Sequence, residues 1–131
     1  MTAQPLAISH RLDKALFTAM LDGLQEAVWL LDAQTLRVLH ANAESTALTG
    51  YEAQTALGLH VDVLCDTLVQ KTFWQDASNW RYGARFLSQI LRSDGLSCAV
   101  EMSVRWLDAS PAMLLLSMLD RSQQLAHEVE L

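Results

Sequence analysis

The two cysteines are the side chains with the greatest capacity for redox or metal chemistry. Cys65 and Cys98 are too few for a disulfide framework, and they do not form a CxxC pair, the spacing typical of redox motifs and zinc sites. Free cysteines are among the residues most often buried in proteins. We therefore expect two buried free thiols, with a redox role as the less favoured alternative.

The four histidines do not have the spacing of metal ligands. The sequence also has no Gly-rich phosphate loop, no GxSxG and no obvious pair of carboxylates. We therefore expect neither a metal site nor catalytic residues, and so no enzymatic activity. The histidines are His10, His40, His60 and His127.

The charge of the chain limits its partners and location. The formal net charge is −6, and the nine Lys and Arg residues are scattered along the sequence, whereas nucleic-acid binding needs them clustered. No apolar run approaches the roughly 20 residues of a membrane span, and residues 1–8 do not resemble a secretory signal. We expect a cytoplasmic domain that binds neither nucleic acid nor a membrane.

The first half of the sequence predicts one long helix and a hairpin. Apolar residues recur at steps of three and four over residues 12–27, which indicates a helix with a wide apolar stripe, interrupted by Gly23. Two short apolar runs, residues 28–32 and 37–41, are joined by a polar turn and predict two antiparallel strands.

Short helices are expected next. Asn42 is a typical N-cap and Gly50 a typical C-terminal residue for a helix over 43–49. A second short helix is predicted over 52–57, and residues 60–82 read as irregular with one further helix.

The last third predicts three strands. Residues 84–92 and 98–106 flank an Asp-Gly turn, which is a strong hairpin signal. Residues 98–106 alternate between apolar and polar side chains, whereas residues 112–119 are apolar on both faces. The second face of this last strand therefore needs a cover, either the N-terminal helix or a partner subunit. The order of elements predicts an α+β fold, with a five-stranded antiparallel sheet, short helices on one side, and flanking N- and C-terminal helices.

Several short motifs follow one another along these elements. They are residues 21–28 (LDGLQEAV), Asp32, Ala41-Asn42-Ala43, residues 48–51 (LTGY), Leu57-Gly58, Asp94-Gly95 and Asp120-Arg121-Ser122. In this order and spacing the sequence resembles a PAS domain, particularly those of bacterial sensor histidine kinases of the nitrogen-regulation type. The resemblance covers about residues 21–122. It implies a PAS-like fold with a flanking dimerisation helix over 1–20 and the start of an output, coiled-coil helix over 123–131.

The resemblance also implies a role in signal coupling for Asp120 and Arg121. In the family, the Asp at this position ends the sheet and ties it to the output helix, often through a polar or basic partner. Candidate partners here are Arg85, Arg105 and Arg121. The simpler interpretation, compatible with the first, is that Asp120 caps the following helix.

PAS domains often hold a cofactor, and each cofactor needs particular residues. A flavin photoreceptor of the LOV type is not expected, because neither cysteine stands in an Asn-Cys-Arg-Phe-Leu-like run. Haem is not expected either, because no histidine occurs between Val61 and Met118. Non-covalent FAD remains an alternative, with Trp74 and Trp80 stacking on the ring and Asn79 bonding its edge. A small organic ligand, or an empty and well-filled core, is preferred to FAD.

His127 and Glu128 resemble the start of a histidine-kinase phosphoacceptor box. Glu130 and Leu131 depart from the residues that should follow, and the segment after Asp120 is much shorter than the linker such kinases use. We therefore favour an exposed histidine on a coiled-coil helix.

The resulting hypothesis is a regulatory domain that dimerises through its flanking helices and passes a cue to an attached effector, in the first place a histidine kinase. The alternative is a small-ligand- or flavin-binding α+β domain that acts alone. This alternative predicts a monomeric protein that carries a bound ligand.

Overall fold

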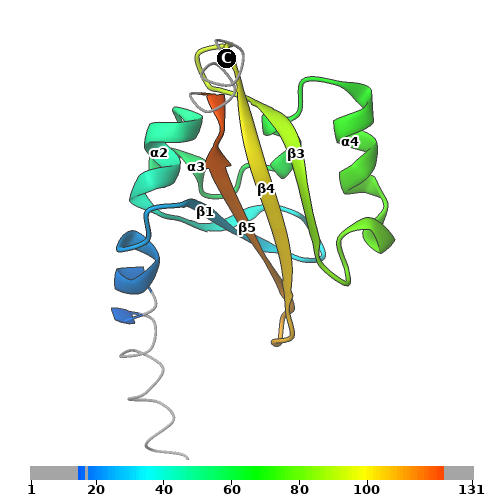
Figure 1. Cartoon of the computed structure of the whole chain (residues 1–131). Helices are drawn as coiled ribbons and strands as arrows, with labels where there is room; N and C mark the ends of the chain where they lie inside the picture. Colours follow the sequence, from blue (N-terminus) through cyan, green and yellow to red (C-terminus); the bar gives the residue numbers. More distant parts are fainter. Residues whose placement is uncertain (1–14, 17, 123–131) are drawn as a thin grey trace, which may run out of the picture.

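A five-stranded antiparallel sheet forms the centre of the protein (Figure 1). The computed structural model describes residues 15, 16 and 18–122. The strand order across the sheet is β2-β1-β5-β4-β3, so the first and last strands are neighbours at its centre. This confirms the predicted α+β fold. The strands are β1 (Ala27–Asp32), β2 (Val38–Ala41), β3 (Ala84–Leu91), β4 (Ser97–Leu107) and β5 (Met113–Asp120).

The segment between β2 and β3 supplies the helices that cover one face of the sheet (Figure 1). The region predicted to be irregular with one helix, residues 60–82, contains one α-helix between two short 3-10 turns. The helical elements are α2 (Ala43–Thr49), α3 (Ala53–Ala56), η1 (Val61–Leu64), α4 (Leu68–Gln75) and η2 (Ala77–Asn79).

Helix α2 begins and ends at the residues that the sequence predicted. The Asn42 side chain accepts a hydrogen bond from the backbone N–H of Ser45, and Gly50 takes the left-handed conformation with φ of 82°. The C-terminal end of α2 is also fixed to the β3–β4 turn, because the Arg92 guanidinium donates to the carbonyl of Leu48 and the N–H of Ser93 donates to the carbonyl of Thr49 at 2.8 Å.

Helix α4 begins with a capping box. The Thr67 hydroxyl accepts from the backbone N–H of Gln70 at 3.2 Å, and the Gln70 side chain accepts from the backbone N–H of Thr67. Thr67 is therefore the N-cap of α4.

The N-terminal helix is shorter than predicted. The described residues 15, 16 and 18–22 are helical, but the helix ends at Gly23, and residue 27 already belongs to β1. The N–H of Gly23 bonds to carbonyls of the preceding turn, which closes the helix there. Figure 1 shows the helix leading away from the sheet. The rest of the predicted flanking segments, including His127, lies outside the described residues.

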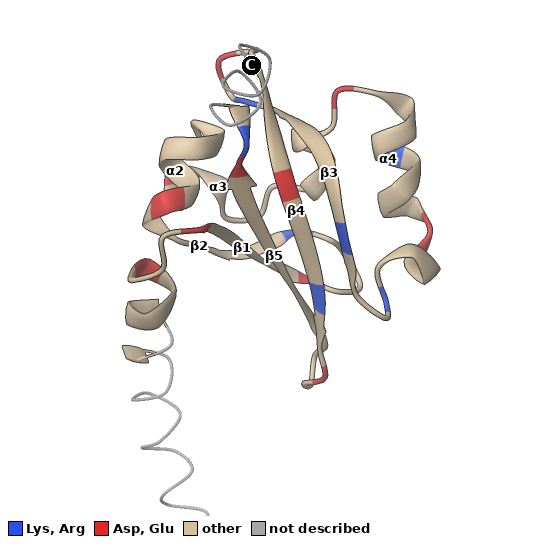
Figure 2. Ribbon diagram, viewed as in Figure 1, with Lys and Arg blue, Asp and Glu red and all other residues tan. Residues whose placement is uncertain are grey.

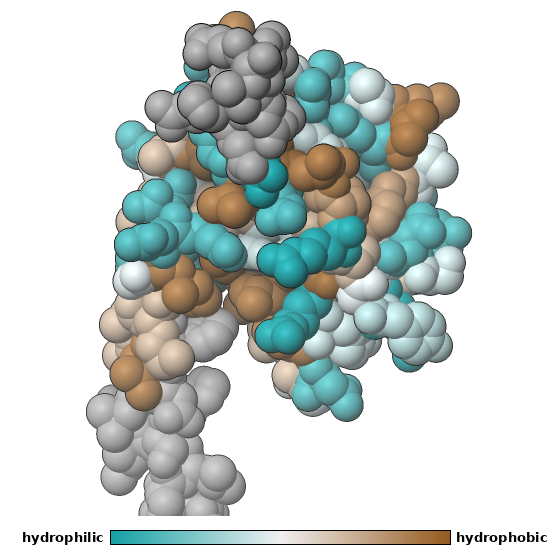
Figure 3. Space-filling model, viewed as in Figure 1, coloured by the Kyte–Doolittle hydropathy of each residue, from teal (hydrophilic) through white to brown (hydrophobic). Residues whose placement is uncertain are grey.

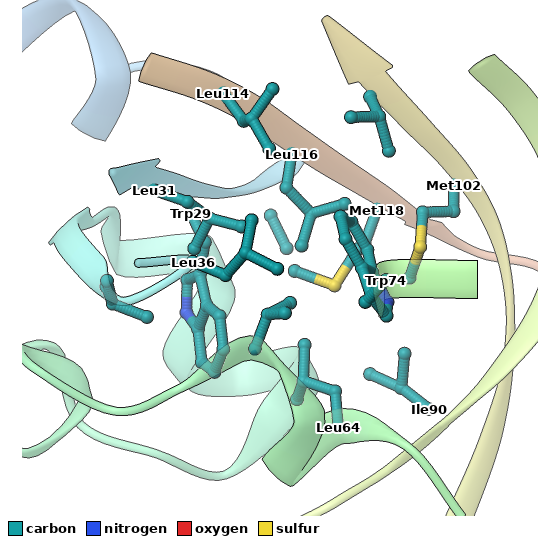
Figure 4. Packing of buried hydrophobic residues seen from close by; sticks show 14 of the residues in the cluster. Trp29, Leu31, Leu36, Leu64, Trp74, Ile90, Met102, Leu114, Leu116 and Met118 are labelled. Carbon is teal, nitrogen blue, oxygen red and sulfur yellow. The ribbon is translucent and has the colours of Figure 1, made fainter. Parts of the chain in front are cut away.

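The hydrophobic core lies between the sheet and its covering helices. Strand β5 contributes Leu114, Leu116 and Met118, which are buried side by side with residues of β1, η1, β4 and α4 (Figure 4). Along β4 the core-facing residues from Cys98 to Val104 are buried while those between them are more exposed, as the alternation predicted. The opposite face of β5 is half-buried from Met113 to Ser117 and exposed at the end, so within the described residues it is covered only in part.

No helix in the described part of the chain is both long enough and apolar enough to span a membrane.

Candidate functional site

An apolar cavity of about 200 Å³ lies between α4 and the β3–β4 side of the sheet. Its aromatic wall is built by Phe73, whose ring lies 4.8 Å from that of Phe86 and 5.1 Å from that of Trp74, the latter in an edge-to-face arrangement. The cavity is lined by Val61, Leu64, Cys65, Val69, Gln70, Phe73, Trp74, Phe86, Leu87, Ser88, Gln89 and Met102.

Few polar groups face this cavity, which decides the class of ligand that it suits. The Gln70 side-chain oxygen is already used, since it accepts from the backbone N–H of Asp66 at 2.7 Å. Ser88 and Gln89 are the other polar lining residues. Because buried polar groups of a ligand need partners, this site favours a mainly apolar molecule.

The thiol of Cys65 belongs to the apolar wall. Burial, with a smaller contribution from the nearby Asp62 carboxylate, raises the pKa of this thiol to about 11. The thiol is therefore protonated and neutral at neutral pH, and a thiol in that state is a weak nucleophile. Both cysteines are free and buried, as the sequence predicted.

The cavity is smaller than the sites that hold drug-sized ligands. An engineered protein cavity of about 150 Å³ holds benzene, whereas sites for drug-sized ligands run from about 300 to 1,000 Å³. At about 200 Å³ the cavity matches a molecule of one ring or a short aliphatic chain. A flavin, with three fused rings, needs more space.

The three residues predicted to bind FAD do not converge on this cavity. Trp74 lines it, but the Trp80 indole donates to the carbonyl of Trp74 at 3.2 Å, and its ring stacks on Trp106 at 6.1 Å. Asn79 is exposed and donates to the carbonyl of Phe73 at 3.3 Å. Both Trp74 and Trp80 are only 5% exposed, so neither offers a free face to a flavin ring. The three residues therefore do not form a flavin site at this cavity.

Trp74 and Trp80 do meet at a second, more polar opening of about 480 Å³, between the β1–β2 turn and the C-terminal end of α4. His60 stands at this opening, where its Nδ1 accepts from the backbone N–H of Asp62 at 3.1 Å. Among the described residues no histidine lines the apolar cavity, and no group of three His, Cys, Asp or Glu residues is arranged to hold a metal ion.

Asp120 and Arg121, the predicted coupling residues, lie at the end of β5. The Asp120 carboxylate accepts from the backbone N–H of Ser122 at 2.8 Å and from the Cys98 thiol at 3.5 Å. The bond from Ser122 is the main cause that lowers the pKa of Asp120. The Arg121 guanidinium lies 3.9 Å from the Glu101 carboxylate.

Within the described residues, none of the three arginines predicted as partners forms an ion pair with Asp120, although the charge of Arg92 contributes to lowering its pKa. Arg121 turns to Glu101, while Arg105 and Arg85 lie farther down the sheet, at the positions paired with Leu115 and Ser103. The bond from the Ser122 N–H has the geometry of a helix N-cap. These contacts therefore agree with the simpler interpretation, in which Asp120 caps the segment that follows it.

The cavity and Asp120 are connected through two paired strands. Met102 lines the cavity and pairs with Met118 of β5, and the next core-facing residue of β4, Val100, pairs with Asp120 itself. A displacement of β4 at the cavity would therefore reach the end of β5 within one pleat of the sheet.

Asn42 has a larger role than the sequence indicated. Its Oδ1 accepts from the N–H groups of Val28 at 2.8 Å and Ser45 at 3.0 Å, and its Nδ2 donates to the carbonyls of Leu21 at 2.8 Å and Glu26 at 2.9 Å. The side chain is fully buried and ties the N-terminal helix, β1 and α2 together. The sequence revealed the local cap but not the partners far away along the chain.

Comparison with known families identifies the same architecture. A family model of the PAS domain matches residues 15–84, which is just over half of the chain and runs from the N-terminal helix to the start of β3. No curated protein matches the sequence.

Solved structures extend the similarity to the remaining strands. A PAS domain from a two-component sensor histidine kinase superimposes with a TM-score of 0.71 at 17% identity, covering 85% of this chain and 98% of that one. An RNA-binding Light-Oxygen-Voltage receptor gives a TM-score of 0.73 at 18% identity, over 88% of this chain and 35% of the receptor. The PAS domain of the fruit-fly ELK potassium channel gives 0.70 at 13% identity, over 82% and 96%. At these identities the structures establish a shared fold.

Proposed function

This chain belongs to the PAS domain family, and on that premise we propose that it is a sensory, non-catalytic module that dimerises and transmits a cue to an attached effector. The preferred candidate for this effector is a histidine kinase, since a similar PAS domain comes from a two-component sensor histidine kinase. In the proposed organisation residues 1–20 form the dimerisation helix, residues 21–122 the sensory domain and residues 123–131 the start of the output helix.

The observation that carries this proposal is the apolar cavity and its connection to the end of the sheet. A small ligand between α4 and β4 would contact Met102, and β4 passes any shift to Asp120 through its pairing with β5. Asp120 caps the segment that leaves the sheet, so the direction of that segment depends on where β5 ends. Two positions of β5 would give the two signalling states.

Dimerisation is supported by the exposed apolar stripe of the N-terminal helix. Leu16 is 59% exposed and Met20 61%, and they are four residues apart, so they share one face of the helix. Leu24, which directly follows the end of the helix, is 45% exposed. An exposed apolar stripe on a helix that leads away from the sheet (Figure 1) is suited to pairing with the same helix of a second copy.

The cavity also supports the second candidate, a small-ligand-binding domain that acts alone. That function needs the cavity but neither the exposed stripe nor the link to Asp120. The two candidates therefore differ in what ligand binding does beyond the cavity.

The test is an NMR titration of the chain with benzene, a probe that matches the size of the cavity. If the proposal is right, amide shifts change at Phe73, Ser88 and Met102 and also at Asp120 and Ser122, because the paired strands carry the displacement. In Asp120→Ala the cavity shifts should remain, while those at residues 121 and 122 should fall to less than roughly half.

Two results would contradict the proposal in different ways. Shifts confined to the cavity in the wild type would favour the domain that acts alone. If benzene causes the same shifts in the wild type and in Ser88→Leu, a variant in which a larger side chain fills the cavity, then benzene does not bind there. That result would show that the cavity is not the sensory site.

A further inference from the structure

A second, larger groove crosses the opposite face of the sheet, away from the core and the covering helices. It has a volume of about 680 Å³ and is separate from the cavity proposed to sense the cue. Its floor is a row of paired residues, with Arg85 of β3 opposite Ser103 of β4, Ser103 opposite Ser117 of β5, and Ser117 opposite Val28 of β1.

The side chains along this row give the groove its shape. Ser103 and Ser117 are small and half-buried at the centre of the sheet, so a partner can approach the strands closely there. The apolar residues Leu24 and Leu115 form one side of the groove, beside the buried Val28 of its floor. This side suits apolar side chains of a partner.

The other side of the groove is basic. Three of the nine Lys and Arg residues of this acidic chain, Arg81, Arg85 and Arg105, line it, against a single lining carboxylate, Glu26. Figure 2 shows basic residues of β3, β4 and the turn before β3 at the same end of the sheet, and in Figure 3 strongly hydrophilic side chains on this face adjoin apolar ones.

These arginines are available for a partner. Within the described residues, Arg92 and Arg121 form ion pairs with carboxylates, whereas Arg81, Arg85 and Arg105 form none. Arg81 is held in place by a cation–π contact, with its guanidinium carbon 5.2 Å from the centre of the Trp106 ring. A fixed guanidinium binds a carboxylate with less loss of side-chain entropy than a free one.

The dimensions of the groove suit a helix. From β3 to β1 the row crosses three strand spacings of about 4.8 Å, or roughly 14 Å, and an α-helix with its side chains is about 10–12 Å across. We propose that this groove binds an amphipathic α-helix of a partner protein, with apolar residues against Leu24 and Leu115 and acidic residues against Arg85 and Arg105.

Charge argues against a second copy of this face as the occupant. In a two-fold symmetric contact the same patch lies on both sides of the interface, so three arginines and only one carboxylate from each copy would be brought into one interface. Like charges across an interface are unfavourable. An acidic helix meets the same groove with opposite charge.

The test uses two labelled helical peptides of about 18 residues, each roughly 27 Å long, with the same leucine stripe. One carries Glu and the other Lys along one flank. Fluorescence anisotropy with the full chain should show the Glu peptide binding at least about tenfold more tightly at roughly 50 mM NaCl, with a smaller difference at roughly 500 mM. The overall charge of −6 would favour the Lys peptide, so a preference for the Glu peptide reports the groove.

Variants locate the binding. The double variant Arg85→Gln with Arg105→Gln should weaken binding of the Glu peptide about fivefold, whereas Lys71→Gln, which removes a charge on α4 outside the groove, should leave it unchanged. Equal affinities for the two peptides, or equal effects of the two substitutions, would overturn the proposal. So would a loss of self-association in the arginine variant without a change in peptide binding, since the groove would then be a contact between copies.

Discussion

Two asparagines show how differently the same side chain is used in this protein. Asn42 is fully buried, and both its oxygen and its nitrogen bond to two backbone groups each. Asn79 is exposed and makes one long bond to a carbonyl. Asn42 therefore joins three elements, whereas Asn79 only bonds to the backbone within a surface turn.

Replacing Asn42 with Ala should therefore be severely destabilising. The substitution leaves the carbonyls of Leu21 and Glu26 and the N–H of Val28 without side-chain partners, and each unsatisfied buried group costs about 1–3 kcal/mol. We expect a loss of at least about 3 kcal/mol in the free energy of unfolding in urea. Asn79→Ala, the matched control, should change it by less than about 0.5 kcal/mol; a similar loss in both variants would contradict the role assigned to Asn42.

Cys65 should make stability depend on alkaline pH. Its thiol pKa is raised from 9.0 in the unfolded chain to about 11 by burial, so the folded state holds this proton more tightly. The stabilisation is fully present below about pH 9 and is lost as the pH rises through about 11. The excess stability of the wild type over Cys65→Ala, measured by urea unfolding, should shrink between about pH 8 and about pH 10.5. If the difference in stability between the wild type and Cys65→Ala stays constant over this pH range, the Cys65 thiol has the same pKa in the folded and unfolded states.

At the residue scale, the sequence predicted what depends on near neighbours. The cap at Asn42 and the left-handed Gly50 follow from local backbone geometry and were both correct. The bonds from Asn42 to Leu21 and Glu26, and the stacking of Trp80 on Trp106, join residues that only the folded chain brings together. For that reason the sequence left two interpretations of the tryptophans open, a flavin platform and core packing, and the contact of Trp80 with Trp106 belongs to the second.

Among the elements, α4 and β3 contribute most to the lining of the cavity, with four residues each. The start of α4 rests on the reciprocal bonds between Thr67 and Gln70. The sequence located the neighbouring hairpins well, since Asp-Gly turns and two-residue alternation are strong signals, but it placed residues 60–82 less definitely because short helices there carry little periodicity.

Thr67→Ala should loosen α4 without affecting the sheet. Loss of an N-cap costs about 1 kcal/mol, so amide hydrogen exchange should quicken in α4 while β4 and β5 keep their protection. Thr72→Ala is the control in the same helix, because the Thr72 hydroxyl bonds only to the carbonyl of Leu68 within the helix. Faster exchange in both variants, or spread over the sheet, would contradict the role of the capping box.

For the whole molecule, the exposed stripe on the N-terminal helix predicts self-association. Met20→Glu should weaken the dimer at least about tenfold in sedimentation experiments, because a charge would enter an apolar contact worth roughly 1.5–3 kcal/mol per side chain. Leu96→Glu makes the same change at a residue 65% exposed in the β3–β4 turn and should leave association unchanged. A monomeric wild type, or equal effects of both substitutions, would rule out dimerisation through this helix.

The position of β5 between β1 and β4 has a consequence for synthesis on the ribosome. Within the sheet of the described residues, the first hairpin, β1–β2, and the second, β3–β4, pair only through β5, the last of the five strands to be translated. Until residues up to Asp120 have emerged, each hairpin exposes an unpaired edge and half of an apolar core, conditions that favour aggregation. The nascent chain should therefore stay sensitive to protease until β5 has left the exit tunnel and then become resistant in a single step.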